Sequence, residues 1–488
     1  MSKVISSLIG SIAFGEVQEH SRMAVQPIVC KKKPELDYLS LSEAVANKVL
    51  AISEVSEGGS VPELRAVNTG ELLVLIMDGE ELVGAKQNRV LNTTVLLPTG
   101  ETILSVSCVE AHRWHRTSDH FSPSEEILTP SMRERKHHQV NLNLERHGSR
   151  SADQGDVWRA VEEMTLRSAT PMSETKAMRD VYRHRDLDLR TLAGQFALVP
   201  GQVGMAVFID GELAGIEYLS QPRVFERVFN KLLRSYALDA LMEEAGADGG
   251  TIDAQIAPGI LAAINAAEMD IYEAVGTGRE HRITGDCVVG SALSLDDEVL
   301  HLSLQASEKQ VAFPRTYWVQ PGRLLAGCYP GDGNHDGNEG RDKLSGLLDS
   351  GIRAVVNLME RGEVNHSGEP FVPYRSKLVD MGIERGIPVV VVRKPIRDVD
   401  VPTREGMKAI LDKIDALLAM GPVYVHCWGG RGRTGTVVGC WLARHGIARG
   451  DQAIEHINKL RRKDPTRHRP SPQTHAQREM IRTWRENE

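Results

Sequence analysis

A cysteine and an arginine separated by five residues form the most chemically suggestive stretch of this sequence. The stretch reads His-Cys-Trp-Gly-Gly-Arg-Gly-Arg-Thr-Gly over residues 426–435, and the pair is Cys427 and Arg433. Glycines allow a loop to turn its backbone NH groups inward, and a following helix adds the positive end of its dipole. Such a loop is suited to holding a tetrahedral anion against a nucleophile.

The side chains of this loop have different expected roles. A thiol in this field is expected to ionise at neutral pH, which makes Cys427 the candidate nucleophile. The planar guanidinium of Arg433 is expected to reach back and hold two oxygens of the anion. We expect the glycines to use positive φ angles. The residues expected to line the anion site are Trp428, Gly429, Gly430, Arg431, Gly432 and Arg433.

The flanking sequence predicts a strand before the loop and a helix after it. Residues 422–425 are a short apolar run rich in β-formers, and residues 436–444 can be read as a helix. Between residues 343 and 425 predicted helices alternate with predicted strands, which favours a parallel sheet covered on both faces. Cys427 would then lie at the carboxyl end of a strand, where α/β sheets bind ligands.

The full pattern resembles the signature of the cysteine-dependent protein tyrosine and dual-specificity phosphatases. The resemblance implies an α/β phosphatase domain over residues 308–488, with a central, mostly parallel sheet flanked by helices. Residues 394–402, Lys-Pro-Ile-Arg-Asp-Val-Asp-Val-Pro, resemble the acid loop of the dual-specificity enzymes and imply Asp398 as the general acid. Asp400 is the alternative, and either could instead cap the helix predicted from Thr403.

Four further positions have supporting roles in this interpretation. Thr434 is expected to donate a hydrogen bond to the thiolate, and His426 to order the loop from behind or simply to be a satisfied core histidine. Gln473 and Gln477 resemble the glutamine segment that positions water in tyrosine phosphatases, although a plain surface helix with Ser471 as its N-cap also fits. Trp428 could line the pocket or pack against the loop.

The expected function is metal-independent hydrolysis of phosphomonoesters through a phosphocysteine intermediate, without a cofactor. Phosphotyrosine and phosphoserine or phosphothreonine in proteins are the first expected substrates. With Arg431, the loop resembles the basic loop of phosphoinositide phosphatases. Phosphoinositides, inositol phosphates and nucleotide-derived phosphates are therefore alternative expected substrates. A phosphate-binding adaptor without activity is the third alternative. The partner is therefore a phosphorylated protein or a small phosphorylated metabolite.

The part of the chain before residue 308 predicts a different domain. Short apolar runs separated by turn residues between Ser60 and Val109 indicate antiparallel sheet, so an α+β domain is expected over residues 1–307. Residues 73–84 and 205–215 are alike, and each is predicted to form a hairpin at Asp-Gly-Glu. The segment from His112 to Arg150, rich in histidine and arginine, is expected to be a solvated loop followed by an exposed helix.

This first half resembles a little-characterised bacterial domain named for its association with ADP-ribosylglycohydrolases and with rhodanese and phosphatase-superfamily proteins. The resemblance rests on residues 78–93, on Ser-Cys-Val-Glu at 107–110 and on Gln-Gly-Asp-Val-Trp at 154–158, and it implies no established chemistry. Six of its polar residues either form a site or satisfy one another within a scaffold: Lys86, Gln87, Asn88, Arg89, Cys108 and Glu110.

Composition narrows the class of protein. A formal net charge of -8 at pH 7 gives no overall attraction to nucleic acid or to an anionic membrane. No apolar run approaches the roughly 20 residues of a membrane span. The six cysteines are scattered without metal spacing, which indicates neither a disulfide framework nor a metal site and favours a reducing, cytoplasmic location. The sequence does not indicate an oligomeric state.

Overall fold

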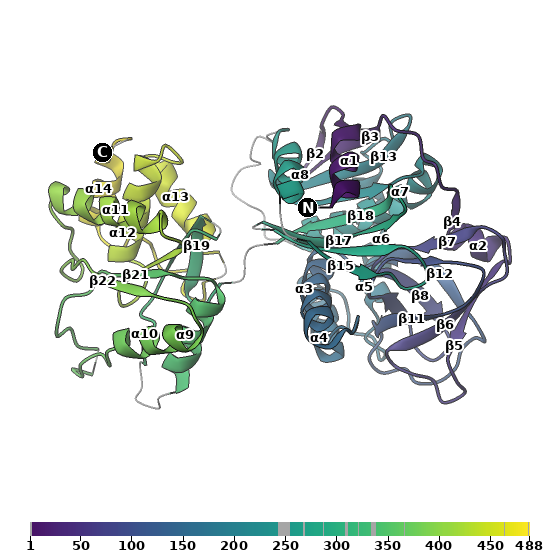
Figure 1. Cartoon of the computed structure of the whole chain (residues 1–488), viewed down its shortest axis with the longest axis horizontal. Helices are drawn as coiled ribbons and strands as arrows, with labels where there is room; N and C mark the ends of the chain where they lie inside the picture. The colour runs from purple at the N-terminus through teal and green to yellow at the C-terminus, as the bar shows by residue number, and fades with distance from the viewer. Residues whose placement is uncertain are drawn as a thin grey trace. The chain divides into compact units, whose positions relative to one another are not determined.

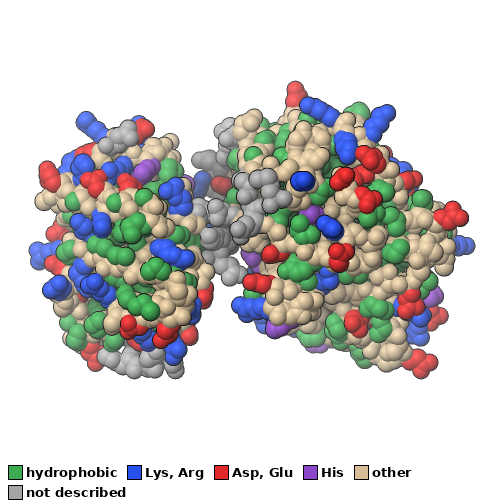
Figure 2. Space-filling model, viewed as in Figure 1, with side chains coloured by type: hydrophobic (Ala, Val, Ile, Leu, Met, Phe, Trp, Pro, Cys, Tyr) green, Lys and Arg blue, Asp and Glu red, His purple; other side chains and the backbone are tan. Residues whose placement is uncertain are grey.

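The computed structural model describes residues 2–242, 254–266, 269–285, 287–307, 311–320, 322–332, 338–365, 367–462, 464–486 and 488. The chain divides into two compact units, Met1–Ser307 and Glu308–Glu488 (Figure 1). On the face drawn in Figure 2, acidic and basic side chains are interspersed with apolar ones over both units. No described helix is long and apolar enough to cross a membrane.

The first unit is built on a large antiparallel sheet with the order β1-β3-β13-β14-β18-β17-β16-β15, in which β2 also pairs with β3. Its strands are β1 (Ile12–Phe14), β2 (Gln18–His20), β3 (Met23–Cys30), β13 (Gln202–Ile209), β14 (Glu212–Leu219), β15 (Met269–Glu273), β16 (Arg279–Thr284), β17 (Val288–Leu295) and β18 (Glu298–Ala306).

Helices cover both faces of this sheet, which explains why every residue of β13 is buried. Met205 and Val207 pack into a core with α7 (Pro222–Met242). Ala206 and Phe208, which point to the other face, pack with α1 and α8. The helices of this unit are α1 (Lys3–Ser11), α2 (Leu41–Ala46), α3 (Pro130–His147), α4 (Gln154–Arg167), α5 (Met178–His184), α6 (Asp186–Ala193), α7 and α8 (Ile256–Ala266).

Two smaller sheets complete the first unit, with the orders β12-β8-β9-β11-β6-β5 and β10-β7-β4. The antiparallel pairs of the six-stranded sheet confirm the antiparallel structure expected between Ser60 and Val109. The strands are β4 (Tyr38–Ser40), β5 (Leu50–Glu54), β6 (Glu63–Asn68), β7 (Leu73–Ile76), β8 (Glu80–Gly84), β9 (Arg89–Leu91), β10 (Val95–Leu97), β11 (Gly100–Cys108) and β12 (Phe121–Ile127).

The two segments that are alike in sequence, residues 73–84 and 205–215, do not fold alike. β13 and β14 form the predicted hairpin, with Ile209 paired with Glu212. The prediction was wrong for residues 73–84, because β7 pairs with β4 and β10 while β8 pairs with β9 and β12. The same turn residues therefore join two strands of one sheet in one case and strands of two different sheets in the other.

The helix expected to be exposed within the segment from His112 to Arg150 is α3, and this prediction was wrong for one face of the helix. Arg133, Lys136 and His137 on α3 are each at most 2% exposed. Arg133 Nη1 lies 2.6 Å from a carboxylate oxygen of Glu217, and Lys136 pairs with Asp78. Because these charges are paired inside the unit, the buried face of α3 can hold charged residues beside the apolar Met132, Val140 and Leu144.

The second unit contains a five-stranded sheet with the order β19-β20-β23-β21-β22. β19 pairs with β20 in the antiparallel sense, and β20, β23, β21 and β22 run parallel. Its strands are β19 (Thr316–Gln320), β20 (Leu324–Gly327), β21 (Ala354–Asn357), β22 (Val390–Arg393) and β23 (Val423–His426).

Helices lie on both sides of this sheet. α9 and α10 lie on one side, and α11, α12, α13 and α14 on the other (Figure 1). α11 begins after Thr403, whose side chain accepts a hydrogen bond from the Gly406 NH as an N-cap. The helices are α9 (Asn338–Asp349), α10 (Arg375–Glu384), α11 (Arg404–Leu418), α12 (Arg433–Arg444), α13 (Asp451–Leu460) and α14 (His475–Thr483).

The start of the last helix differs from the predicted one. Thr474, not Ser471, is the N-cap of α14, and it forms a capping box with Gln477. Ser471 is buried and its hydroxyl donates to the carbonyl oxygen of Arg431 at 2.9 Å. The serine that looked like a helix cap therefore holds the loop that follows Cys427.

Candidate active site

Cys427 follows the last residue of β23, the central strand of the second unit. Its side chain is 3% exposed. β20 and β21 flank β23 in parallel, so the carboxyl ends of these strands meet at the edge where Cys427 lies. The loop of residues 428–432 then leads directly into α12, which begins at Arg433. The N-terminus of α12 thus adjoins the loop.

The loop is held in place through its carbonyl groups. Because the NH and C=O of one peptide point in nearly opposite directions, these bonds leave the NH groups of Gly429, Gly430 and Gly432 directed to the other side. Within the described part of the chain, those three NH groups donate no hydrogen bond. The outward bonds are Tyr329 N to Trp428 O at 2.9 Å, Arg315 Nη2 to Gly429 O at 2.8 Å, Ser471 Oγ to Arg431 O at 2.9 Å and Thr436 N to Gly432 O at 2.9 Å.

Only one of the three loop glycines takes a positive φ, which corrects the expectation for the other two. Gly430 has φ 73°. A Cβ on Gly430 would lie 2.7 Å from the carbonyl carbon of Gly327, so the loop passes too close to β20 for any side chain. Gly432 has φ -73°, and a Cβ there would meet the amide of Gln477 at 3.2 Å.

Arg433 is 1% exposed and is held by a carboxylate from another part of the unit. Its Nη1 and Nη2 donate to the two oxygens of Glu363 at 2.5 and 3.0 Å, and Nη1 also donates to the Ile396 carbonyl at 3.1 Å. Glu363 thus occupies the Nη1–Nη2 edge of the guanidinium. The Nε of Arg433 has no hydrogen-bond partner among the described residues, so Nε is the donor left for an anion, while Nη2 also lies 3.0 Å from Asp398 Oδ1.

The surroundings of Arg433 stabilise its charged form. Burial lowers the pKa of Arg433, but the hydrogen bond with Glu363 and the charges of Cys427, Glu363 and Asp398 outweigh it and raise that pKa above its usual value. Arg433 is therefore a fixed positive charge in the site.

Asp398 lies beside Arg433, as the resemblance implied for a residue of the same site. Its Oδ1 is 3.0 Å from Arg433 Nη2, and its side chain is 53% exposed. Asp400 is directed elsewhere, since its Oδ1 accepts from the Val401 NH at 2.9 Å. Between them Val399 has φ 63°, a conformation that costs a β-branched residue about 1–3 kcal/mol.

Gln477 braces this strained loop. Its Nε2 donates to the Asp400 carbonyl at 3.2 Å, while its Oε1 accepts from the NH groups of Gln473 and Thr474 at 3.1 Å each. Gln477 is fully buried, whereas Gln473 is exposed. That either glutamine orients water stays a prediction. The side-chain amide of Gln477 is already hydrogen-bonded to the backbone, which makes Gln473 the better candidate.

His426 is buried behind the loop in a single protonation state. Its Nδ1 lies 3.0 Å from the carbonyl oxygen of Cys427, and its Nε2 lies 2.6 Å from the Tyr374 hydroxyl. A carbonyl can only accept, so Nδ1 carries the proton and Nε2 accepts from Tyr374. Burial lowers the pKa of His426 to about 3 and raises that of Tyr374, which keeps both groups neutral.

The remaining predicted residues have structural contacts in addition to any role with a ligand. Thr434 Oγ1 donates to the Gly327 carbonyl at 3.4 Å, so the expected bond to the thiolate is not the contact found here. The Trp428 ring packs edge-on against Phe371, with 5.3 Å between the ring centres. The Trp428 ring packs against Phe371 on one side and can line a ligand site on its other side, so both predictions for Trp428 agree with the structure.

Arg431 is half-buried beside other cations. Its guanidinium forms no hydrogen bond or ion pair with any residue that the structure describes. Burial and the neighbouring charges of Arg469, Arg461 and Arg315 lower the pKa of Arg431. The positive charge at this rim of the loop is thus incompletely neutralised by protein groups.

Three residues of the site were not predicted from the sequence: Glu363, Tyr374 and Arg315. Glu363 belongs to the segment that follows β21, the parallel neighbour of β23, and a carboxylate in that segment was a usable signal. Tyr374 and Arg315 stand at places where neither a motif nor a periodicity marks them. Their contacts depend on how the chain returns to the loop.

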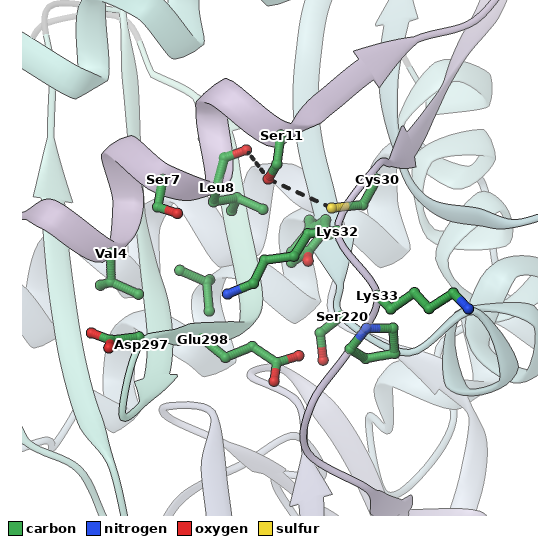
Figure 3. Close-up of a pocket in the computed structure, with 13 residues that line it drawn as sticks. Val4, Ser7, Leu8, Ser11, Cys30, Lys32, Lys33, Ser220, Asp297 and Glu298 are labelled. Atoms are coloured by element: carbon green, nitrogen blue, oxygen red, sulfur yellow. Dashed lines mark hydrogen bonds between the residues drawn. The ribbon is translucent and has the colours of Figure 1, made fainter.

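A separate hollow lies in the first unit, between α1 and the turn that joins β17 to β18 (Figure 3). The Lys32 side chain extends into it, and Glu298 stands opposite. Glu298 already accepts the NH groups of Glu35 and Leu36 at 3.0 Å each. The Glu298 carboxylate thus stabilises the local backbone. In the described part of the chain, no group of three or more His, Cys, Asp or Glu residues could hold a metal ion.

The cysteine loop lies in a part of the chain that is similar to the dual-specificity and protein tyrosine phosphatases. A family model described as "Polymorphic toxin system, DSP-PTPase phosphatase" matches residues 333–447. A model described as "ARG and Rhodanese-Phosphatase-superfamily-associated Protein domain" matches residues 11–305, more than half of the chain, and the chain belongs to this family. The resemblances drawn from both halves of the sequence are confirmed.

Individual relatives were also found. An uncharacterised protein of Methanocaldococcus jannaschii, MJECL20, is 36% identical over 78 residues, which are 16% of this chain and 51% of that protein. The chain thus spans about half the length of this curated relative. The solved structure of Tk-PTP in its active form is 27% identical over 35% of this chain and 95% of that one, with a TM-score of 0.25. PTPMT1 in complex with PI(5)P is 20% identical over 35% and 94%, with a TM-score of 0.26.

Proposed function

We propose that residues 308–488 hydrolyse phosphomonoesters through a phosphocysteine intermediate on Cys427. The observation that carries the proposal is Arg433, which is buried beside the cysteine with its Nη1–Nη2 edge held by Glu363 and its Nε unpartnered. A guanidinium fixed in this way presents Nε to one phosphoryl oxygen, and Nη2 can bind a second oxygen when Asp398 turns from it towards the leaving group. The NH groups of the loop add further donors to the same anion.

The first chemical step transfers the phosphoryl group to sulfur. The Cys427 thiolate attacks phosphorus, the bond from phosphorus to the leaving oxygen breaks, and Asp398 gives that oxygen a proton. Arg433 and the NH groups of the loop stabilise the charge on the phosphoryl oxygens throughout. The position of Asp398, whose Oδ1 lies 3.0 Å from Arg433 Nη2, supports its role as the proton donor.

The second step regenerates the enzyme. Asp398, now a carboxylate, takes a proton from water, the water oxygen attacks phosphorus, and the sulfur–phosphorus bond breaks to release inorganic phosphate and the thiolate. Protein cations and NH groups supply the positive charge that the reaction needs, so the proposed mechanism uses neither a metal nor a cofactor. A reducing compartment such as the cytoplasm would keep Cys427 available.

Phosphorylated proteins are the first substrate class that we propose. Arg431 supports a second one, because an unpaired guanidinium at the rim is placed to bind another phosphate of the same molecule. That substrate would be a phosphoinositide, an inositol phosphate or a nucleotide-derived phosphate. A phosphate-binding adaptor is less well supported, since binding alone requires neither a nucleophile nor Asp398.

The test is hydrolysis of p-nitrophenyl phosphate with EDTA present. Wild type should turn over, Cys427→Ser should not, and Cys287→Ser, which alters an exposed cysteine of the first unit, should behave as wild type. Full turnover by Cys427→Ser would overturn the mechanism. Binding of phosphate without turnover in the wild type would favour the adaptor.

A further inference from the structure

Among the residues that the structure describes, buried lysines and arginines are paired with a carboxylate in all cases but one. Arg89 on β9 is the exception: it is 0% exposed, and within the described part of the chain it has no ion pair with an acidic group. Burying an unpaired charge is costly, so such a group needs another explanation. The buried cations that have a carboxylate partner are Arg113, Arg133, Lys136, Lys231, Arg234, Arg282, Arg433 and Arg461.

The contacts of Arg89 leave one edge of its guanidinium unused. Nη1 donates to Gln87 Oε1 at 3.1 Å and lies 3.0 Å from Cys108 Sγ. Nε and Nη2 are both buried without a hydrogen-bond partner among the described residues. Nε and Nη2 are the two donors that bind the oxygens of a carboxylate or phosphate side by side.

The neighbouring cysteine does not supply the missing negative charge. Gln87 Nε2 donates to the Glu110 carbonyl at 2.9 Å, which fixes the amide so that Oε1 faces the sulfur at 2.7 Å. An oxygen in that position can only accept, so Cys108 is a protonated donor. Burial raises the pKa of the Cys108 thiol, in agreement with this. Cys108 and Gln87 thus orient Arg89 and leave its charge uncompensated.

An exposed indole covers the guanidinium. The ring centre of Trp114 is 5.8 Å from Arg89 Cζ and 5.4 Å from Lys86 Nζ, and Trp114 is 47% exposed. Trp114 belongs to the connection between β11 and β12, outside any helix or strand. That connection is anchored at Arg113, which pairs with Glu110 at 2.7 Å. Because the indole is exposed and the backbone beside it is anchored, the Trp114 side chain can change rotamer without a movement of the connection.

We propose that the Nε–Nη2 edge of Arg89 is a binding site for an oxyanion, the carboxylate or phosphate of a small ligand that enters by displacing the indole of Trp114. The bound anion supplies the negative charge that Arg89 lacks, and Lys86 adds positive potential beside the same ring. This site belongs to the first unit and does not depend on the activity proposed for the second.

The test is calorimetric titration of the full chain with sodium phosphate and, separately, with sodium acetate, in an Arg433→Met background so that the cysteine loop does not contribute. We expect one saturable site whose Kd rises by at least about tenfold in Arg89→Met. Binding of acetate alone would identify a carboxylate ligand, and binding of phosphate alone a phosphorylated one. No binding of either anion, or the same Kd in Arg89→Met, would overturn the proposal.

Two further measurements separate binding from folding. Without anion, Arg89→Met should melt no lower than its parent because it removes an uncompensated charge, whereas Arg133→Met should melt lower because it strands Glu217. Anion binding should change tryptophan emission in the parent and in Trp484→Phe, which alters an indole of the second unit, but not in Trp114→Phe. An emission change that persists in Trp114→Phe would contradict displacement of this indole.

Discussion

Glu363 binds both terminal nitrogens of Arg433 although 70 residues separate them in the sequence. The pair fixes which edge of the guanidinium faces the cysteine loop. We therefore expect Glu363→Gln to lower kcat/KM on p-nitrophenyl phosphate by about tenfold to a hundredfold, the usual value of a charge-assisted hydrogen bond. Inhibition by inorganic phosphate should weaken in parallel, because the same edge of Arg433 binds it.

The matched control is Glu360→Gln, which alters an exposed carboxylate in the same segment. It should leave kcat/KM unchanged. If Glu363→Gln kept full kcat/KM with a normal melting temperature, Glu363 would not be the residue that positions Arg433.

The two aspartates of the acid loop should behave differently. Asp398→Asn should lower kcat by about a hundredfold or more, with little change in phosphate inhibition, because it removes the proton donor but not the anion site. Asp400→Asn should have little effect, since its carboxylate caps the neighbouring backbone. Steady-state kinetics at several pH values would check this, and the reverse ranking would assign the acid to Asp400.

Arg431 should discriminate between substrate classes. If the unpaired guanidinium binds a second phosphate, Arg431→Gln should reduce kcat/KM by about tenfold or more on an inositol bisphosphate and much less on p-nitrophenyl phosphate. Arg462→Gln, an exposed arginine of the same unit, is the control. Equal losses on both substrates would show that Arg431 supports the loop and does not select the substrate.

His426 should make stability depend on pH. Its folded pKa of about 3 lies below the ordinary value of 6.5, so the unfolded chain binds the extra proton between these limits. Its contribution is complete above about pH 6.5 and is lost, by up to about 1.4 kcal/mol per pH unit, as the pH falls towards 3.

Urea unfolding of the wild type and of His426→Gln at pH 7.5, 6 and 5 would measure this. The difference in unfolding free energy between them should shrink as the pH falls. His475→Gln, which alters an exposed histidine, should run parallel to the wild type. A constant difference for His426→Gln would mean that folding does not lower the pKa of His426.

The first unit shows where local sequence and tertiary structure diverge. The same Asp-Gly-Glu turn forms a hairpin between β13 and β14 but separates β7 from β8, because strand partners are chosen by the cores on which each strand packs. The polar face of α3 is buried for a similar reason. Its partners, Glu217 and Asp78, come from distant strands that no local pattern identifies.

The cysteine loop could be read from the sequence because its requirements are local. Cys427 and Arg433 lie within one strand, loop and helix, and glycine spacing, β-forming residues and helical pattern follow one another over a few residues. The families of both halves were also evident from such local motifs, and the comparisons confirmed them.

Tertiary structure decided what local sequence does not contain. The edge of Arg433 left for an anion depends on Glu363, and the neutral state of His426 on Tyr374 and on burial. Whether the charge of Arg89 is compensated depends on every side chain that packs around it. The physical reason is common to all three: hydrogen bonding and burial are set by residues brought together from distant parts of the chain, whereas propensity and spacing are properties of neighbours.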